Sequence, residues 1–179
     1  MKELSYSVVS TVERYPEAAE VVVRAGDCAI VERAGTQRQL VIRCPDGCGE
    51  VLSINLDPRS GPAWRLYKRA GRWSLYPSID RTSGCMSHFI LWNGRICWAD
   101  AYDSAEEDAP DRLSPPVLAL LNGRVSASYV QLADEIGELP WDVLAACRAL
   151  ARKDVLVEGS GKQRGIFSVK PAGLPNISA

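Results

Sequence analysis

Histidine is scarce in this sequence, and its scarcity narrows the chemistry that the protein can perform. His88 is the one histidine among 179 residues, so any reaction that needs an imidazole must use it. An excess of charge of one sign is also lacking, because the formal net charge is −1 at pH 7. That balance argues against a protein whose whole surface coats nucleic acid or a membrane, although a local basic patch stays compatible with it.

Long apolar runs are lacking as well. No stretch approaches the roughly 20 apolar residues of a membrane-spanning helix, and residues 1–5 lack the apolar core of a signal peptide. We therefore expect a cytoplasmic location and no membrane partner. In that reducing compartment, the six cysteines are expected to be metal ligands, core residues or reactive thiols and not disulfides.

Three of the cysteines lie in turns rich in glycine and proline, where burial alone would not favour a thiol. Cys44 and Cys48 belong to the turn at residues 43–50 (RCPDGCGE), and Cys85 belongs to residues 84–89 (GCMSHF). Zinc binds thiolates and imidazoles in a tetrahedral shell of four ligands. The pattern therefore predicts a structural zinc ion, which would help to hold a small domain together.

The fourth zinc ligand is open between two residues. Cys97 would lie across the Asn93-Gly94 hairpin from Cys85, and His88 follows Cys85 closely in the chain, while Asp46 is a more distant candidate. The alternative is that these thiols are separate core residues. A redox pair is disfavoured, because the two-cysteine turn lacks the C-x2-C spacing and the helix on which such pairs usually lie.

The first half of the chain alternates short strand-like runs with turns, which predicts a mainly antiparallel β domain over residues 1–102. Asn93-Gly94 is its strongest local signal, a two-residue hairpin turn. Cys28 lies within one run and is expected to be a core residue. The expected strands are Glu20–Ala25, Cys28–Glu32, Gln39–Arg43, Val51–Leu56, Trp64–Tyr67, Trp73–Tyr76, His88–Trp92 and Arg95–Ala99.

The second half of the chain begins with an acidic segment and then turns helical. Residues 103–112 carry no apolar anchor and predict a linker. In residues 113–179, Pro115-Pro116 should open a first helix and Ser126 should cap a second. The expected elements are helices at Val117–Leu121, Tyr129–Ile136 and Trp141–Arg152, then strands at Val155–Glu158 and Ile166–Val169 around a wing. This order resembles a winged helix-turn-helix, so the expected fold class is α+β.

The charges of this second domain favour a protein partner over DNA. Between Leu113 and Lys170 there are seven basic and six acidic residues. The third helix begins with Trp141 and Asp142, where contacts to bases usually fall, although Lys162 and Arg164 in the wing could reach phosphates. We therefore expect a winged helix that binds a protein.

A histidine beside a serine could supply a general base and a nucleophile. Adjacent side chains of a strand point to opposite faces, so Ser87 would need a bulge to reach His88. Ser78 could instead face His88 from a neighbouring strand. Glu50, or less favourably Asp80, could orient the imidazole. The sequence leaves the nucleophile open between the two serines, and it leaves His88 open between a base and a zinc ligand.

Three blocks in a fixed order resemble one bacterial family. They are residues 44–49 (CPDGCG), 74–79 (SLYPSI) and 85–90 (CMSHFI), followed by Gly94, Ile96 and Trp98. The family is that of zinc-containing serine peptidases from bacterial ubiquitination-like (Bub) operons. These operons encode ubiquitin-like proteins beside relatives of ubiquitin-activating and ubiquitin-conjugating enzymes. The resemblance covers about residues 5–100.

This resemblance implies specific roles for individual residues and specific partners. His88 would be the base, and the zinc ligands that carry over are Cys44, Cys48 and Cys85. Many members have a further cysteine where Asp46 stands here, so Cys97 or His88 would complete the ligand set. The implied partners are a ubiquitin-like protein substrate and its conjugation enzymes.

Two functions are thus weighed for the whole chain. The leading one is a serine peptidase or isopeptidase that processes a ubiquitin-like protein or removes it from targets. An extended protein tail could add as a strand to a sheet edge, a common mode of peptide recognition. The alternative is a non-enzymatic, zinc-containing binding or regulatory protein that acts through its winged helix.

Overall fold

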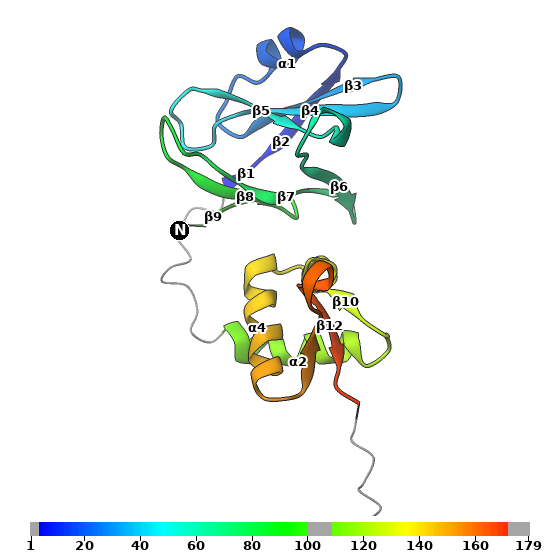
Figure 1. Cartoon of the computed structure of the whole chain (residues 1–179). Helices are drawn as coiled ribbons and strands as arrows, with labels where there is room; N and C mark the ends of the chain where they lie inside the picture. The colour runs from blue at the N-terminus through cyan, green and yellow to red at the C-terminus, as the bar shows by residue number, and fades with distance from the viewer. Residues whose placement is uncertain (1–3, 100–108, 172–179) are drawn as a thin grey trace, which may run out of the picture. The chain divides into compact units, whose positions relative to one another are not determined.

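The computed structural model describes residues 4–99 and 109–171, and it divides the chain into two compact units, Met1–Ala105 and Glu106–Ala179. The α+β class is confirmed, with sheets in the first unit and helices in the second (Figure 1). The expected domain boundaries at residues 102 and 113 stay a prediction. No helix among the described residues is long and apolar enough to cross a membrane.

Two packed sheets and one helix form the N-terminal unit (Figure 1). One sheet has the order β2-β3-β4-β5 and the other β1-β9-β8-β7-β6; every pair is antiparallel except β2–β3, which is parallel. The strands are β1 Leu4–Ser5, β2 Ser7–Val12, β3 Asp27–Arg33, β4 Thr36–Arg43, β5 Val51–Asn55, β6 Arg65–Arg69, β7 Arg72–Asp80, β8 His88–Trp92 and β9 Arg95–Trp98.

The expected strand at Glu20–Ala25 is wrong, because Tyr15–Val21 form helix α1. Two parallel strands cannot be joined by a tight turn, so the chain between β2 and β3 must cross over, and α1 is that crossover. Pro16 fits the first turn of the helix. Ala18 and Val22 are fully buried against the outer face of the sheet, as the position of α1 in Figure 1 illustrates. Tertiary burial therefore overrides the strand propensity of the valines.

The main core lies between the two sheets and follows the alternation of each strand. In β3, Cys28 and Ile30 face the other sheet, whereas Ala29 and Val31 face α1. The expectation that Cys28 is a core residue is confirmed, and burial raises the pKa of its thiol. From the second sheet, Leu75, Ile79, Phe89, Leu91 and Ile96 complete this core.

Strands β7 and β8 pair with an irregularity in the middle of β7. Leu75 pairs with Leu91 and Ile79 pairs with Phe89, so four steps along β7 match two along β8. Leu75 and Ile79 nevertheless both face the core. The two additional residues lie in the stretch that contains Ser78, and such irregularities are common next to functional sites.

The loop between β5 and β6 is fixed by polar contacts. Asp57 is 5% exposed, and its carboxylate accepts hydrogen bonds from the backbone N–H of Arg59 and from the guanidinium groups of Arg59 and Arg38. The Arg59 guanidinium holds the pKa of this carboxyl well below its usual range. Asn55 Nδ2 then donates to the Pro62 carbonyl at 2.9 Å. These contacts set the course of the chain into Trp64.

The C-terminal unit has three helices and a small sheet. The elements are α2 Ala109–Leu121, β10 Ala127–Ser128, α3 Tyr129–Ile136, α4 Pro140–Arg152, β11 Leu156–Glu158 and β12 Ile166–Val169, with sheet order β10-β12-β11. The three helices and the strands β11 and β12 follow the expected order, and β10 is an additional two-residue strand between α2 and α3. Cys147 is fully buried on α4, and burial raises the pKa of its thiol to about 12.

Two expectations about the helices are wrong. Pro115 and Pro116 lie inside α2, which already begins at Ala109, so the end of the expected linker, residues 109–112, is helical; residues 103–108 lie outside the described residues. The helix persists through the prolines because side chains at every fourth position are buried: Ala109, Leu113, Val117 and Leu121. Ser128, not Ser126, caps α3, in a capping box with Gln131.

The core position of Phe89 gives a stability prediction. Phe89 is fully buried and packs edge-on against Trp98, with ring centroids 5.6 Å apart. We expect Phe89→Ala to lower the free energy of unfolding by about 3–5 kcal/mol, in urea titrations followed by tryptophan fluorescence at fixed zinc concentration. Val23→Ala is the control, because Val23 is 70% exposed. Equal effects of the two substitutions would contradict the assigned core.

Candidate functional site

Three cysteines from two distant segments converge at one end of the N-terminal unit. Cys44 follows β4, Cys48 lies in the turn after it, and Cys85 lies in the loop from β7 to β8. Their sulfur atoms all lie within 4.8 Å of one another, and those of Cys44 and Cys85 are 3.7 Å apart. This group, the cysteine cluster, joins the ends of strands that belong to opposite sheets.

The cysteine cluster fits a zinc ion in donor type and spacing. Zinc with Zn–S bonds of about 2.3 Å holds two tetrahedral sulfur ligands about 3.8 Å apart, close to the separation between Cys44 and Cys85. Burial raises the pKa of the Cys44 thiol, whereas the hydrogen bond with Ser87 lowers the pKa of the Cys85 thiol. A bound cation favours thiolates at all three positions.

Arg81 contacts all three members of the cysteine cluster, and sequence reasoning missed it. Its Nη1 atom lies 2.7 Å from the sulfur of Cys85, 3.6 Å from that of Cys48 and 3.8 Å from that of Cys44. The side chain is only 10% exposed. Arg81 therefore places positive charge beside the thiols. No spacing in the sequence signals this, because Arg81 reaches the sulfurs only after the β7–β8 loop folds back.

Glu50 pairs with Arg81, although the sequence suggested that it would orient His88. It directly follows the cysteine turn, so its carboxylate points into the cluster and lies 3.8 Å from the sulfur of Cys48. A carboxylate oxygen could serve there as a further metal ligand. Gly84 leaves room for this pairing, since a Cβ atom at its position would lie 2.8 Å from Glu50 and 2.6 Å from Arg81.

Ser87 points away from His88, as strand alternation predicts, whereas Cys97 does not lie in the cluster that it was a candidate to complete. Ser87 is 6% exposed and turned toward the cysteine cluster, where the Cys85 thiol donates to its Oγ at 3.2 Å. Cys97 lies on β9 opposite Ile90, two strand positions from His88, and is not one of the three clustered thiols. The hairpin register places Cys97 beside the middle of β8, whereas the cluster forms at the end of that strand.

Ser78 and His88 lie against each other on neighbouring strands. The Nε2 atom of His88 is 3.0 Å from the Oγ atom of Ser78, within the range of a nucleophile–base hydrogen bond. Ile79 and Phe89 face the core, so the residues next to them in sequence face outward. Both members of the pair are half-buried. The structure thus brings His88 to Ser78 and turns the adjacent Ser87 away.

Asp80 completes a polar group on this outer face. It pairs directly with His88 across β7 and β8. One residue beyond this pair, Arg81 N–H donates to the Ser87 carbonyl at 3.1 Å, and hydrogen-bonded and non-hydrogen-bonded pairs alternate along an antiparallel ladder. Asp80 and His88 are therefore a non-hydrogen-bonded pair, in which opposed side chains lie closest. A carboxylate is available beside the imidazole at this position.

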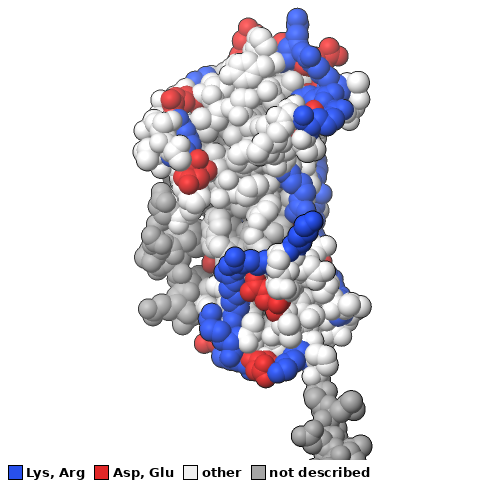
Figure 2. Space-filling view, viewed as in Figure 1, with Lys and Arg blue, Asp and Glu red and all other residues white. Residues whose placement is uncertain are grey.

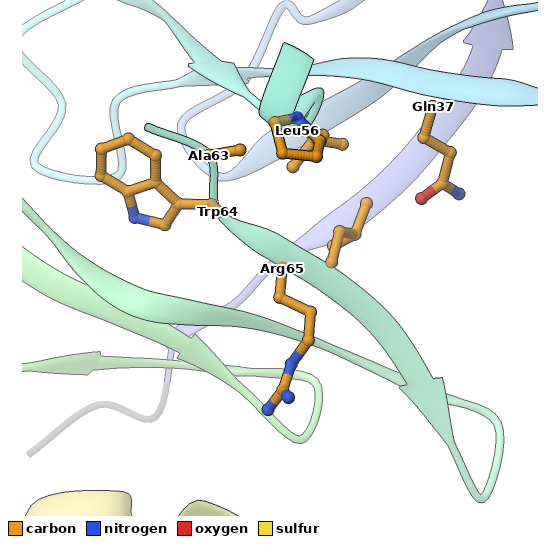
Figure 3. Close-up of a pocket in the computed structure, with 7 residues that line it drawn as sticks. Gln37, Leu56, Ala63, Trp64 and Arg65 are labelled. Atoms are coloured by element: carbon orange, nitrogen blue, oxygen red, sulfur yellow. The ribbon is translucent and has the colours of Figure 1, made fainter. Parts of the chain in front are cut away.

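Trp64 links the Ser78 strand to a pocket near the start of β6. Its Nε1–H donates to the Ser78 carbonyl at 3.2 Å. Trp64 also lines a largely apolar pocket of about 310 Å³ together with Leu56, Ala63 and Arg65 (Figure 3). Figure 3 shows the side chains of Trp64 and Arg65 pointing in different directions. Neither Ser78 nor His88 lines this pocket.

One comparison with known proteins gives a result. Residues 11–99 match the family model described as "Bacterial ubiquitination-like system serine protease (BubE)". The matched segment runs from β2 to the end of β9 and contains the cysteine cluster, Ser78 and His88. Neither the curated proteins nor the solved structures gave a significant match.

The cysteine cluster predicts the metal content of single variants. We expect about one zinc ion per chain in the wild type and little in Cys85→Ser, because three thiolates and one further ligand make up the closed shell. Cys97→Ser is the matched control and should keep its zinc, since Cys97 is not in the cluster. Elemental analysis of purified protein measures both. Zinc loss in Cys97→Ser, with retention in Cys85→Ser, would contradict the assignment.

Proposed function

Since the chain belongs, through residues 11–99, to the serine protease family of bacterial ubiquitination-like systems, we propose that it is a peptidase that processes a ubiquitin-like protein or removes it from targets. The proposed nucleophile is Ser78 and the proposed general base is His88. The single observation that supports these roles is the 3.0 Å separation of Ser78 Oγ and His88 Nε2. The conjugation enzymes of such a system are the further partners that we propose.

The proposed reaction is acyl transfer in two steps. Ser78 Oγ attacks the carbonyl carbon of the scissile amide while His88 Nε2 takes the hydroxyl proton. The imidazolium then gives that proton to the leaving amine as the C–N bond breaks, which leaves an ester on Ser78. Water, deprotonated by the same imidazole, hydrolyses the ester and restores the serine. An ε-amine of a target lysine can leave in the same way as an α-amine once the imidazolium has protonated it, so the same steps serve an isopeptidase.

Asp80 is the carboxylate that we propose as a positioning residue. An imidazole that takes a proton becomes positive, and a neighbouring carboxylate stabilises that charge and fixes the tautomer. Asp80 lies directly opposite His88 on β7. Glu50 is less suited to this role because Arg81 already neutralises it.

The cysteine cluster has a structural part in the proposal. Cys44, Cys48 and Cys85 would hold a zinc ion, with Glu50 as the proposed fourth ligand. A zinc ion held there would supply a cross-link between the two segments, and the proton transfers would be left to Ser78 and His88. The last pair of β7 and β8 before the loop is Asp80 with His88. One residue beyond it, Arg81 N–H donates to the Ser87 carbonyl. A cross-link at Cys85 would therefore keep the strands in register beside the serine and the histidine.

For the C-terminal unit we propose a winged helix that binds a protein. Four of the basic side chains counted between Leu113 and Lys170 are already paired with carboxylates: Arg124, Arg148, Lys153 and Lys170. On the face of this unit visible in Figure 2, basic and acidic atoms lie side by side. A DNA-binding face would leave a run of basic side chains unpaired. The alternative function, a regulatory protein without enzymatic activity, would rest on this unit.

Substitution of the serines tests the proposed nucleophile. We expect Ser78→Ala to slow cleavage of a ubiquitin-like protein with a short C-terminal extension by about 10³-fold or more, because the attacking oxygen is lost. Ser87→Ala should retain most activity where zinc is retained, since its hydroxyl faces the cysteine cluster. Gel or mass-spectrometric assays of the released extension give the rates.

His88→Ala is the companion variant and should lose activity while keeping its zinc. If it loses zinc instead, and the wild type cleaves no ubiquitin-like protein, the histidine is a metal ligand and the non-enzymatic alternative gains. If Ser87→Ala alone abolishes cleavage with its zinc in place, the assignment of Ser78 is wrong.

A DNA-binding assay tests the role of the C-terminal unit. We expect the full chain to bind a mixed-sequence duplex no more tightly than non-specific binding, with a Kd above about 10⁻⁶ M at physiological salt. Fluorescence anisotropy at several salt concentrations measures both the affinity and its salt dependence. Nanomolar binding that weakens steeply with salt would instead assign this unit to DNA.

A further inference from the structure

Strand β7 extends beyond its neighbour β6 at the end that carries Ser78. The β6–β7 ladder ends with the pair Arg65 and Tyr76, while β7 continues to Asp80. The chain before β6 does not follow β7, because Trp64 N–H donates instead to the Asn55 carbonyl of β5 at 2.8 Å. Within residues 4–99, no strand pairs with residues 77–80 of β7 on the β6 side.

The backbone of Asp80 points toward this open side. Arg81 N–H bonds to the Ser87 carbonyl, so the preceding residue, Asp80, has its N–H and C=O directed away from β8. His88 confirms the pattern on the other strand, because its carbonyl accepts from Ala99 N–H on the β9 side at 2.9 Å. One donor and one acceptor of an exposed residue thus face the space beyond the end of β6.

Pro77 and Ser78 offer fewer free backbone groups on this side of β7 than Asp80 does. Ser78 also directs its carbonyl to the β6 side, where it is capped by the Trp64 indole N–H at 3.2 Å. Pro77 has no N–H to offer. The side of β7 next to the proposed nucleophile therefore offers the paired donor and acceptor of Asp80, which is the arrangement that one residue of an added strand satisfies with two hydrogen bonds.

We propose that the substrate binds in extended conformation along β7 at Asp80, as a strand that takes the place of a longer β6. The occupant is the C-terminal tail of the ubiquitin-like protein together with the residues that follow the scissile bond. This inference rests on the proposed function, because it uses Ser78 and His88 as the reacting groups.

The geometry suits cleavage next to the site of pairing. Neighbouring strands lie about 4.8 Å apart, so an added strand passes immediately beside β7. Ser78 is two residues from Asp80 on the same strand, and His88 faces Asp80 from the other side. A chain paired at Asp80 therefore runs past the serine hydroxyl. Of the four edge strands of the two sheets, β1, β2 and β5 are not adjacent to β7, and β6 pairs with β7 only as far as Arg65 and Tyr76.

Recognition of this kind reads the backbone more than the side chains. Two hydrogen bonds from a single main-chain residue fix the register, whatever its side chain is. The site should thus select a flexible, extended tail and reject a peptide bond held in a helix or inside a folded domain. A folded ubiquitin-like body followed by a free tail meets this condition.

N-methylation of the substrate backbone tests the proposal on the full-length enzyme. The probe is a set of synthetic peptides that cover the tail and a C-terminal extension, each with one N-methylated amide within three residues of the scissile bond. In an added strand, alternate residues direct their N–H toward β7. Because Asp80 offers one backbone acceptor, we expect kcat/KM to fall about tenfold or more when the one amide that donates to its carbonyl is methylated, and much less for the immediate neighbours of that amide.

Two controls separate the outcomes. Reaction of Ser78 with a fluorophosphonate and hydrolysis of a small activated ester report on the serine and histidine without a peptide strand, and both should be lost in Ser78→Ala. Hydrogen exchange on Ser78→Ala should show protection of the Asp80 amide when the unmodified peptide binds. If Ser78 reacts but N-methylation at no single position slows cleavage and the Asp80 amide stays unprotected, strand addition is wrong. If Ser78 is inert and no peptide is cleaved, the proposed function itself fails.

Discussion

The pairing of β7 with β8 is the constraint on which the rest of the N-terminal unit depends. One register places Ile79 and Phe89 in the core and, by alternation, Ser78, Asp80 and His88 on the outer face. A shift by one residue would bury the polar groups and expose the aromatic ring. Because burial of Phe89 and Ile79 stabilises the unit by several kcal/mol, the same free energy that folds the sheets also positions the serine beside the histidine.

The cysteine cluster lies at the end of this strand pair, where the loop from β7 to β8 begins and ends. The loop from β7 to β8 is closed on one side by the Arg81–Ser87 backbone bond and is held on the other by Cys85, which faces two cysteines of the opposite sheet. A metal ion there would join the sheets at a point where few apolar side chains are available. The arginine among the thiols fits this account, since it offsets negative charge that a thiolate cluster concentrates in a half-buried place.

Much of the fold was predictable from local sequence signals. The Asn93-Gly94 hairpin, the strand at Cys28–Glu32 and the order of helices and strands after Leu113 all depend on short-range patterns, and the structure has them. Helix α1 and the start of α2 were not predictable in this way. The valines near Val22 favour a strand and the prolines at 115 and 116 favour a helix start, but burial at spaced positions decides both cases.

The sequence predicted which residues belong to the candidate site but not how they are arranged. The sequence identified Ser78, His88 and three cysteines, but it could not choose between Ser78 and Ser87, because that choice depends on which face of β8 is buried. It also placed Glu50 with His88, since a sequence does not show that Arg81 would turn back and pair with it. Contacts made through a folded loop are the ones that spacing cannot supply.

The irregular stretch of β7 has a consequence for how this family can vary in length. Between Leu75 and Ile79 the strand holds two more residues than its partner. An even number leaves the alternation of faces intact, so both flanking side chains still reach the core. A relative could gain or lose residues here in pairs without disturbing the sheet. A single insertion or deletion would invert the positions after it unless a one-residue bulge absorbs it, as one does between Val8 and Ser10 of β2 and between Gln37 and Gln39 of β4.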